Sequence, residues 1–170
     1  MTAKLPFFVS GLPRSRTAWM ANWLTTDHSL CLHDEPFAVN KVALGRMTGF
    51  SGSEICTQFD DVEKAFPVSP WVIILRKPAD AFESFMLASG LDRTAEAVAL
   101  WWDARLKLLA QLCRKPNVEA IPFDDLDSEQ TARQVWSHLM QGKPFNLERW
   151  LLLWKLSVTQ HPMKASKVWL

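Results

Sequence analysis

Apolar runs along the chain predict four strands of one parallel sheet. The run from Trp71 to Leu75 is unbroken, which is typical of a central parallel strand covered on both faces. Pro122 lies near the end of the last run and favours an edge position there, because proline cannot donate a hydrogen bond to a neighbouring strand. The four predicted strands cover residues 5–9, 29–33, 71–75 and 118–123.

Between these runs, apolar residues recur at the spacing of helices. The widest apolar face is predicted for residues 94–112, where Thr94 has the residue type of an N-cap. Asp127 or Ser128 is expected to cap a later helix that ends near Met140. The predicted helices cover residues 17–24, 39–47, 54–66, 79–88, 94–112, 128–140 and 147–158.

Glycine and hydroxyl residues dominate the stretch from Thr48 to Ser53 and predict a loop. A surface connection is the simpler interpretation of this loop, and a flap that faces a substrate is the alternative. The alternation of strands and helices predicts an α/β fold, a three-layer α/β/α arrangement with a central parallel sheet. The length of 170 residues favours a single domain over residues 1–170.

Charge and cysteine content exclude several classes of protein. The 19 Lys and Arg residues are balanced by 18 Asp and Glu residues, so a nucleic-acid partner is not expected. Cys31, Cys56 and Cys113 are widely spaced, which favours reduced thiols in a cytoplasmic protein over a zinc site. The first predicted strand begins near residue 5, so no signal peptide is expected. No membrane-spanning helix is expected either, because no apolar run approaches ~18 residues.

The first predicted strand runs into a tight loop and then into the start of a helix. Such a junction directs backbone N–H groups and the positive end of the helix at one point. Arg14, Ser15, Arg16 and Thr17 add two guanidinium groups and two hydroxyls, which favours phosphate or sulfate as the ligand. The alternative is a basic helix start that is exposed to solvent.

This loop is not a Walker A loop, because it fails the pattern G-x-x-x-x-G-K-[ST] in either register. Counted from Ser10, only Thr17 fits, and counted from Gly11, the last three positions fail. Arg76 follows the strand that ends at Leu75, where a metal-dependent phosphotransferase would place an Asp that reaches Mg²⁺. Both features count against an ATPase or a kinase.

His33, Asp34 and Glu35 follow the second predicted strand and precede Pro36, which disfavours continuation of the strand. Ligands of open parallel sheets bind outside the carboxyl ends of the strands. These titratable residues are therefore expected on the same rim as the anion loop. Strand geometry predicts that His33 and Glu35 share a face and that Asp34 points away.

The pattern Gly-x-Pro-Arg-Ser-x-Thr-x-Trp over residues 11–19 resembles the phosphosulfate-binding loop of the sulfotransferases. These enzymes use 3′-phosphoadenosine 5′-phosphosulfate (PAPS) and have a P-loop NTPase-like α/β fold. Arg16 stands where the family usually has Gly, so an arginine must adopt the backbone angles of that position. The matching residues are Pro13, Arg14, Ser15, Thr17 and Trp19.

Residues 76–84 resemble the second sulfotransferase motif, which is Arg-x-Pro-x-Asp with a Ser eight residues after the Arg. The resemblance implies that Arg76 and Ser84 bind the 3′-phosphate of the cofactor. Phe123 begins a Phe-Asp-Asp-Leu segment that resembles the family's Tyr-Glu-Asp-Leu. This implies that Phe123 contacts the adenine without the tyrosine hydroxyl.

The resemblance implies a sulfotransferase that moves a sulfuryl group from PAPS to a hydroxyl or amine of a small-molecule, carbohydrate or lipid acceptor, without a metal. Glu35 is the first candidate for the base and His33 is the second. Arg14 would stabilise the departing phosphate, and Trp19 would stack on the adenine. The residues expected to bind the cofactor are Arg14, Ser15, Arg16, Thr17, Ala18, Trp19, Arg76, Ser84 and Phe123.

Two alternatives stay open. A kinase-like nucleotide phosphotransferase with a degenerate loop is opposed by the missing Walker residues. A catalytically inactive nucleotide-binding module of the same fold is favoured by Arg16 and by the lack of a match to the Arg-Lys-Gly segment that closes over the 3′-phosphate in many sulfotransferases. Lys164 and Lys167 could replace that segment. The sequence names neither the acceptor nor the oligomeric state.

Overall fold

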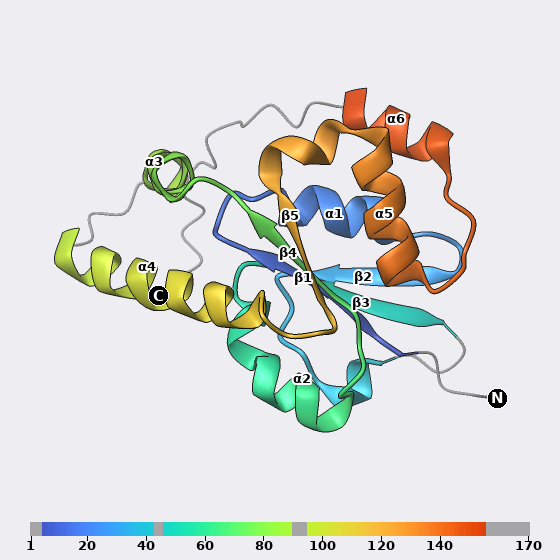
Figure 1. Cartoon of the computed structure of the whole chain (residues 1–170), viewed down its shortest axis with the longest axis horizontal. Helices are drawn as coiled ribbons and strands as arrows, with labels where there is room; N and C mark the ends of the chain where they lie inside the picture. Colours follow the sequence, from blue (N-terminus) through green and yellow to red (C-terminus); the bar gives the residue numbers. More distant parts are fainter. Residues whose placement is uncertain (1–4, 43–45, 90–94, 156–170) are drawn as a thin grey trace.

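The computed structural model describes residues 5–42, 46–89 and 95–155. In these ranges a parallel sheet forms the centre, with the strand order β2-β3-β1-β4-β5 (Figure 1). The predicted α/β fold class is confirmed. The strands are β1 (Phe7–Gly11), β2 (Ser29–His33), β3 (Met47–Ser51), β4 (Trp71–Leu75) and β5 (Val118–Pro122).

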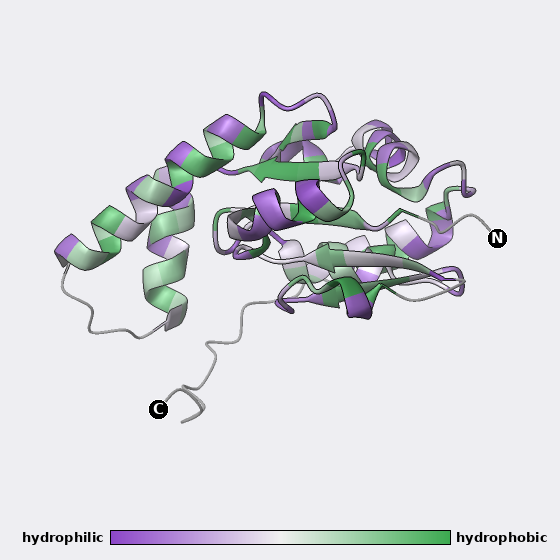
Figure 2. Ribbon diagram, turned by 90° about the horizontal axis from the view of Figure 1, so that it is seen from below, coloured by the Kyte–Doolittle hydropathy of each residue, from purple (hydrophilic) through white to green (hydrophobic). Residues whose placement is uncertain are grey.

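Helices cover both faces of this sheet. Buried residues of α1, α5 and α6 pack on one face, and those of α2, α4 and the start of α3 pack on the other. Figure 2 shows that the strands between these layers are largely apolar. The helices are α1 (Thr17–Leu24), α2 (Phe59–Ala65), α3 (Pro78–Ser89), α4 (Ala95–Leu112), α5 (Glu129–Met140) and α6 (Leu147–Lys155).

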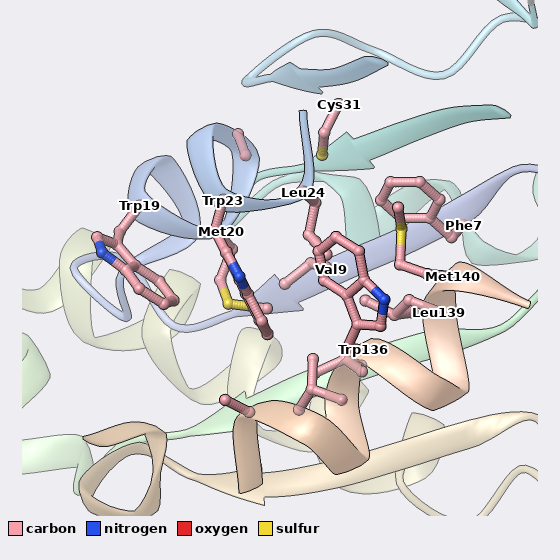
Figure 3. Close-up of a cluster of buried hydrophobic side chains, with 14 of the residues drawn as sticks. Phe7, Val9, Trp19, Met20, Trp23, Leu24, Cys31, Trp136, Leu139 and Met140 are labelled. Carbon is pink, nitrogen blue, oxygen red and sulfur yellow. The ribbon is translucent and has the colours of Figure 1, made fainter. Parts of the chain in front are cut away.

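The two buried clusters follow from the alternation of side chains along each strand. In β1, Phe7 belongs to the cluster with α1 and α5, whereas Phe8 belongs to the opposite cluster. The buried residues of β4 alternate in the same way. Figure 3 shows the first cluster, in which the rings of Trp23 on α1 and Trp136 on α5 lie 5.6 Å apart. This packing fixes α1, and with it the loop that precedes α1.

The predictions for residues 39–42 and 46–51 are wrong, and residues 43–45 of the predicted helix lie outside the described residues. Val39–Lys41 forms only a short 3-10 helix, η1, and the loop expected from Thr48 contains most of β3, which is buried throughout between β1 and β2. Gly49 contributed to the prediction of a loop, because glycine is uncommon inside a strand. A Cβ at Gly49 would lie 2.0 Å from the ring of Phe7, so this glycine makes room for an aromatic side chain.

The other differences concern the ends of elements. The helix predicted over residues 54–66 divides into η2 (Ile55–Gln58) and α2, and η3 (Phe123–Asp127) follows β5. The edge position of β5 and the N-cap Ser128 are confirmed. Thr94 and residues 156–158, predicted as helix ends, lie outside the described residues. In the described part of the chain, no helix is both long and apolar enough to cross a membrane.

Replacing Gly49 with Ala is expected to lower the free energy of unfolding by about 1–3 kcal/mol, the usual cost of overpacking a filled core. The added methyl group would collide with Phe7, whose ring lies 2.0 Å from the Cβ position. Phe7→Leu makes room for this methyl group. The double variant Gly49→Ala with Phe7→Leu should therefore lose less free energy of unfolding than the sum of the losses in the two single variants. Denaturant unfolding of the three variants measures this coupling. Strictly additive losses would contradict it.

Candidate functional site

The turn between β1 and α1 contains two arginines in the left-handed backbone region, Arg14 at φ 69° and Arg16 at φ 61°. This region is costly for residues other than glycine. The turn is held by a hydrogen bond from the Ser15 N–H to the carbonyl of Leu12 (3.2 Å) and by one from Arg76 Nη1 to the carbonyl of Arg14 (2.6 Å). The angle at Arg16 explains why a glycine suits this position in the loops that the sequence resembles.

The start of α1 has the donors of an anion site. Arg16 makes no side-chain cap, and the first turn of the helix carries no acidic residue, so the first N–H groups of the helix remain for a ligand. The Oγ of Ser15 is fully buried and has no hydrogen-bond partner among the described residues. Ala18 is exposed and offers its N–H in this turn. An anion would satisfy these groups.

Three arginines surround the same turn. Arg14 Nε lies 3.5 Å from the Oγ of Ser84, so the structure brings together the two motifs identified in the sequence. The pKa of Arg76 is lowered by burial and by the nearby charges of Arg14 and Arg16, although Asp80 and Asp124 act in the opposite direction. Like charges held this close indicate a site whose potential favours an anion.

Phe123 lies beside this turn, whereas its contact with an adenine stays a prediction. The Arg16 guanidinium stacks 4.7 Å from the centre of the Phe123 ring and 4.4 Å from that of Trp154, and Arg76 also lies 4.7 Å from Phe123. Such contacts stabilise cations over aromatic rings. Trp154 was not identified from the sequence, where it reads only as an apolar residue of the last amphipathic helix.

Trp19 is too deeply buried to stack on a nucleotide base with much of its ring. Its side chain is 8% exposed, and its Nε1 donates to the carbonyl of Leu153 at 3.1 Å. Its ring contacts those of Trp23 and Trp154 at 5.3 and 5.6 Å. The structure therefore places Trp19 in the core that supports the turn, with little of the indole left to meet a ligand.

The rim after β2 departs from strand geometry. Asp34 has φ 52°, and its carboxylate lies 3.3 Å from Nδ1 of His33. The prediction that Asp34 points away from His33 is therefore wrong, because it assumed an extended backbone. The other ring nitrogen of His33, Nε2, lies 3.5 Å from the Oγ1 of Thr17 on α1. Glu35 instead forms an ion pair with Lys41 at 2.7 Å.

A pocket of about 520 Å³ lies at the carboxyl ends of β2 and β3. Its wall is tied to β1, because the N–H of Gly52 donates to the carbonyl of Val9 (3.1 Å) and Ser10 Oγ donates to the carbonyl of Gly52 (2.9 Å). The pocket therefore lies on the same rim as the anion turn. Its lining residues are Asp34, Glu35, Pro36, Gly52, Ser53, Glu54, Ile55, Thr57 and Gln58.

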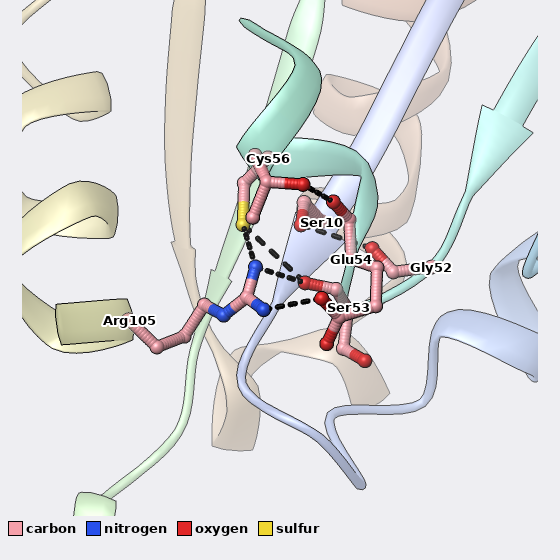
Figure 4. A network of polar contacts seen from close by, with 7 residues as sticks. Ser10, Gly52, Ser53, Glu54, Cys56 and Arg105 are labelled. Atoms are coloured by element: carbon pink, nitrogen blue, oxygen red, sulfur yellow. Dashed lines mark hydrogen bonds and ion pairs between the residues drawn. The ribbon is translucent and has the colours of Figure 1, made fainter. Parts of the chain in front are cut away.

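Arg105 holds the segment after β3 that contributes Ser53 and Glu54 to the lining of this pocket. It is 4% exposed, and from α4 it points to the loop after β3 (Figure 4). It donates to the carbonyl of Ser53 (3.2 Å), to Cys56 Sγ (3.0 Å) and to the carboxylate of Glu54 (2.5 Å). Burial alone would lower the pKa of Arg105, but the interactions with Cys56 and Glu54 raise it. This buried contact had a sign in the sequence, because the charge of Arg105 interrupts the apolar face predicted for residues 94–112.

Among the described residues, no group of His, Cys, Asp and Glu side chains is arranged to hold a metal ion. The described cysteines are all free. Burial raises the pKa of the Cys31 and Cys113 thiols, so these residues are poorly suited to act as nucleophiles.

No protein-family model matches the sequence, and no curated protein matches it. Solved structures do resemble the fold. Mouse sulfotransferase SULT7A1, complexed with PAP, superposes with a TM-score of 0.63 at 13% identity, over 89% of this chain and 63% of the mouse chain. A sulfotransferase from Alicyclobacillus acidocaldarius superposes with a TM-score of 0.54 at 14% identity, over 87% of this chain and 89% of the bacterial chain.

These likenesses establish the fold. The chain has the α/β sulfotransferase fold, with a parallel sheet of five strands in its described part. It spans 63% of the length of the mouse protein. The fold expected from the resemblance of residues 11–19 and 76–84 is confirmed.

Replacing Arg105 with Ala is expected to lower the free energy of unfolding by about 2–3 kcal/mol, because its charged hydrogen bonds to Ser53, Cys56 and Glu54 are lost. Lys107→Ala is the control, since Lys107 is 72% exposed on the same helix and forms an ion pair with Asp103 one turn away. The Lys107→Ala variant should lose no more than about 0.5 kcal/mol of its free energy of unfolding. Denaturant unfolding compares the two variants, and equal losses would contradict a structural role for Arg105.

Proposed function

We propose that the protein is a PAPS-dependent sulfotransferase. The observation that carries the proposal is the meeting of two sequence motifs at one basic turn, where Arg14 reaches Ser84 and Arg76 holds the carbonyl of Arg14. The buried and unpartnered Oγ of Ser15 fits the phosphate groups of such a nucleotide. The structural neighbour bound to PAP, the product nucleotide, supports this choice of ligand.

The residues divide between the two ends of the nucleotide. Ser15, Arg16, Thr17 and Ala18 would bind the 5′-phosphosulfate through the Ser15 hydroxyl and the N–H groups at the start of α1. Arg76 would bind the 3′-phosphate, together with Ser84 of α3, through its forked guanidinium. When bound, PAPS supplies the sulfuryl group that is transferred.

Further residues would complete the nucleotide site. Phe123 would contact the adenine from beside the turn. Trp19, assigned to the base by resemblance, would act here by supporting the turn from the core. A guanidinium group acts through its positive charge and its N–H donors, so Arg14 would stabilise the phosphate that leaves by electrostatic attraction rather than by donating a proton.

His33 is the better candidate for the base, ahead of Glu35. Its Nε2 lies against Thr17 in the anion turn (3.5 Å), whereas Glu35 is bound to Lys41 (2.7 Å). His33 would accept the proton of the acceptor O–H or N–H as that oxygen or nitrogen bonds to sulfur. The bond between sulfur and the phosphate oxygen breaks at the same time, and its electron pair stays with the phosphate.

Residues 1–170 would form one sulfotransferase domain that acts in the cytoplasm on a small-molecule, carbohydrate or lipid acceptor, with no metal and no nucleic acid. A catalytically inactive nucleotide-binding module is the second candidate. The stacking of Arg16 on Phe123 and Trp154 favours it, because this side chain occupies aromatic surface that a base would use.

PAP is expected to stabilise the protein against heating more than AMP does, with or without Mg²⁺, because AMP lacks the 3′-phosphate. Ligand at about one hundred times its Kd should add roughly 2.7 kcal/mol. Arg76→Ala should weaken PAP binding by about 1.5–3 kcal/mol, whereas Arg114→Ala, which removes an exposed arginine just after α4, should leave it unchanged. Thermal shift and calorimetry measure these effects. Equal stabilisation by AMP and PAP would exclude the proposed nucleotide.

His33→Asn is expected to lower sulfuryl transfer by about 10²–10⁴-fold, the usual effect of losing a general base, while PAP binding is retained. Glu35→Gln should have a much smaller effect, since the Glu35 carboxylate contacts Lys41. Release of PAP from PAPS, measured over a panel of acceptors, gives both rates. Loss of turnover in Glu35→Gln with normal turnover in His33→Asn would return the role of base to Glu35.

A further inference from the structure

The backbone turns sharply one residue after β2 ends. Side chains that follow one another in a strand point to opposite faces, but Asp34 has φ 52°, a conformation that aspartate adopts more readily than most residues. The turn brings Oδ2 of Asp34 to 3.3 Å from Nδ1 of His33. It is held by a hydrogen bond from the Asp34 N–H to the carbonyl of Ser51 at 2.9 Å.

Gly52 leaves the space that this carboxylate occupies. A Cβ at Gly52 would lie 2.7 Å from Oδ1 of Asp34 and 3.3 Å from its Cα. Gly52 is itself fixed to β1 through Val9 and Ser10. The position of the carboxylate beside His33 is therefore set by the sheet and by the absence of a side chain at Gly52.

The other carboxylates of the pocket are engaged elsewhere. Glu35 pairs with Lys41 and Glu54 pairs with Arg105. Among the described residues of this rim, Asp34 is thus the acid that contacts the imidazole of His33.

We propose that Asp34 is a positioning residue that holds neutral His33 with its proton on Nδ1. The partner of one ring nitrogen decides which nitrogen carries the proton, so an Nδ1–H donated to Asp34 leaves the lone pair of Nε2 toward Thr17 and the anion turn. If His33 then accepts a proton at Nε2, the Asp34 carboxylate stabilises the imidazolium. This catalytic consequence rests on the proposed function, whereas the protonated nitrogen can be observed without it.

The position of the proton is measured by NMR of the full chain with isotope-labelled histidine, using two-bond couplings between ring nitrogens and protons. The His33 signals are assigned with a His33→Asn variant. Wild-type His33 should carry its proton on Nδ1, and Asp34→Asn should shift it wholly or partly to Nε2, because the Asn amide can donate as well as accept. Asp103→Asn is the control, since Asp103 pairs with Lys107 on the distant surface of α4. A proton on Nε2 in the wild type, or no change in Asp34→Asn, would overturn the proposal.

Steady-state kinetics of sulfuryl transfer test whether Asp34 assists His33 as the base. Asp34→Asn should lower kcat by about tenfold or more with little change in the KM for PAPS, and Asp34→Glu should recover part of the loss. Gly52→Ala should act in the same direction, because its methyl group displaces the carboxylate. Normal kcat in Asp34→Asn alongside an inactive His33→Asn would overturn the positioning role. If the wild type turns over no acceptor while the proton still lies on Nδ1, the sulfotransferase proposal fails and the assignment of His33 stands.

Discussion

The candidate site depends on one hydrogen bond, which Arg76 donates to the carbonyl of Arg14 at 2.6 Å. It joins the end of β4 to the turn after β1, so two strands that neighbour each other in the sheet share one basic cluster. Arg14 and Arg16 both lie in the left-handed region, where each residue costs on the order of 1–3 kcal/mol. The bond from Arg76 and the stacking of Arg16 on Phe123 and Trp154 offset part of this cost.

The same turn explains why the anion donors remain available. An N-cap side chain or an early acidic residue would normally satisfy the first turn of α1, and neither is present there. Arg16 directs its guanidinium to aromatic rings instead of capping the helix. The strain of the turn and its capacity to bind an anion therefore have the same structural origin.

Those parts of the fold and site that rest on local pattern could be predicted from the sequence. The apolar run from Trp71 to Leu75 is β4, as predicted. The resemblance of the two motifs implied that Arg14, Arg76 and Ser84 share a site, and in the structure Arg14 lies against Ser84 while Arg76 donates to the carbonyl of Arg14. That these residues bind a nucleotide stays a prediction. β3 was missed because Gly49 looks like a loop residue until the ring of Phe7 is seen to fill its space. The contact between Asp34 and His33 depends on a single backbone angle, which strand alternation does not predict. The burial of Trp19 depends on α6, more than a hundred residues further along the chain.

A structure of the protein bound to PAP would show directly whether the turn between β1 and α1 holds this nucleotide. We expect the 5′-phosphate against the Oγ of Ser15 and the first N–H groups of α1, with the 3′-phosphate between Arg76 and Ser84. The adenine should lie beside Phe123. A nucleotide bound away from this turn, or a 3′-phosphate that contacts neither Arg76 nor Ser84, would rule out this site.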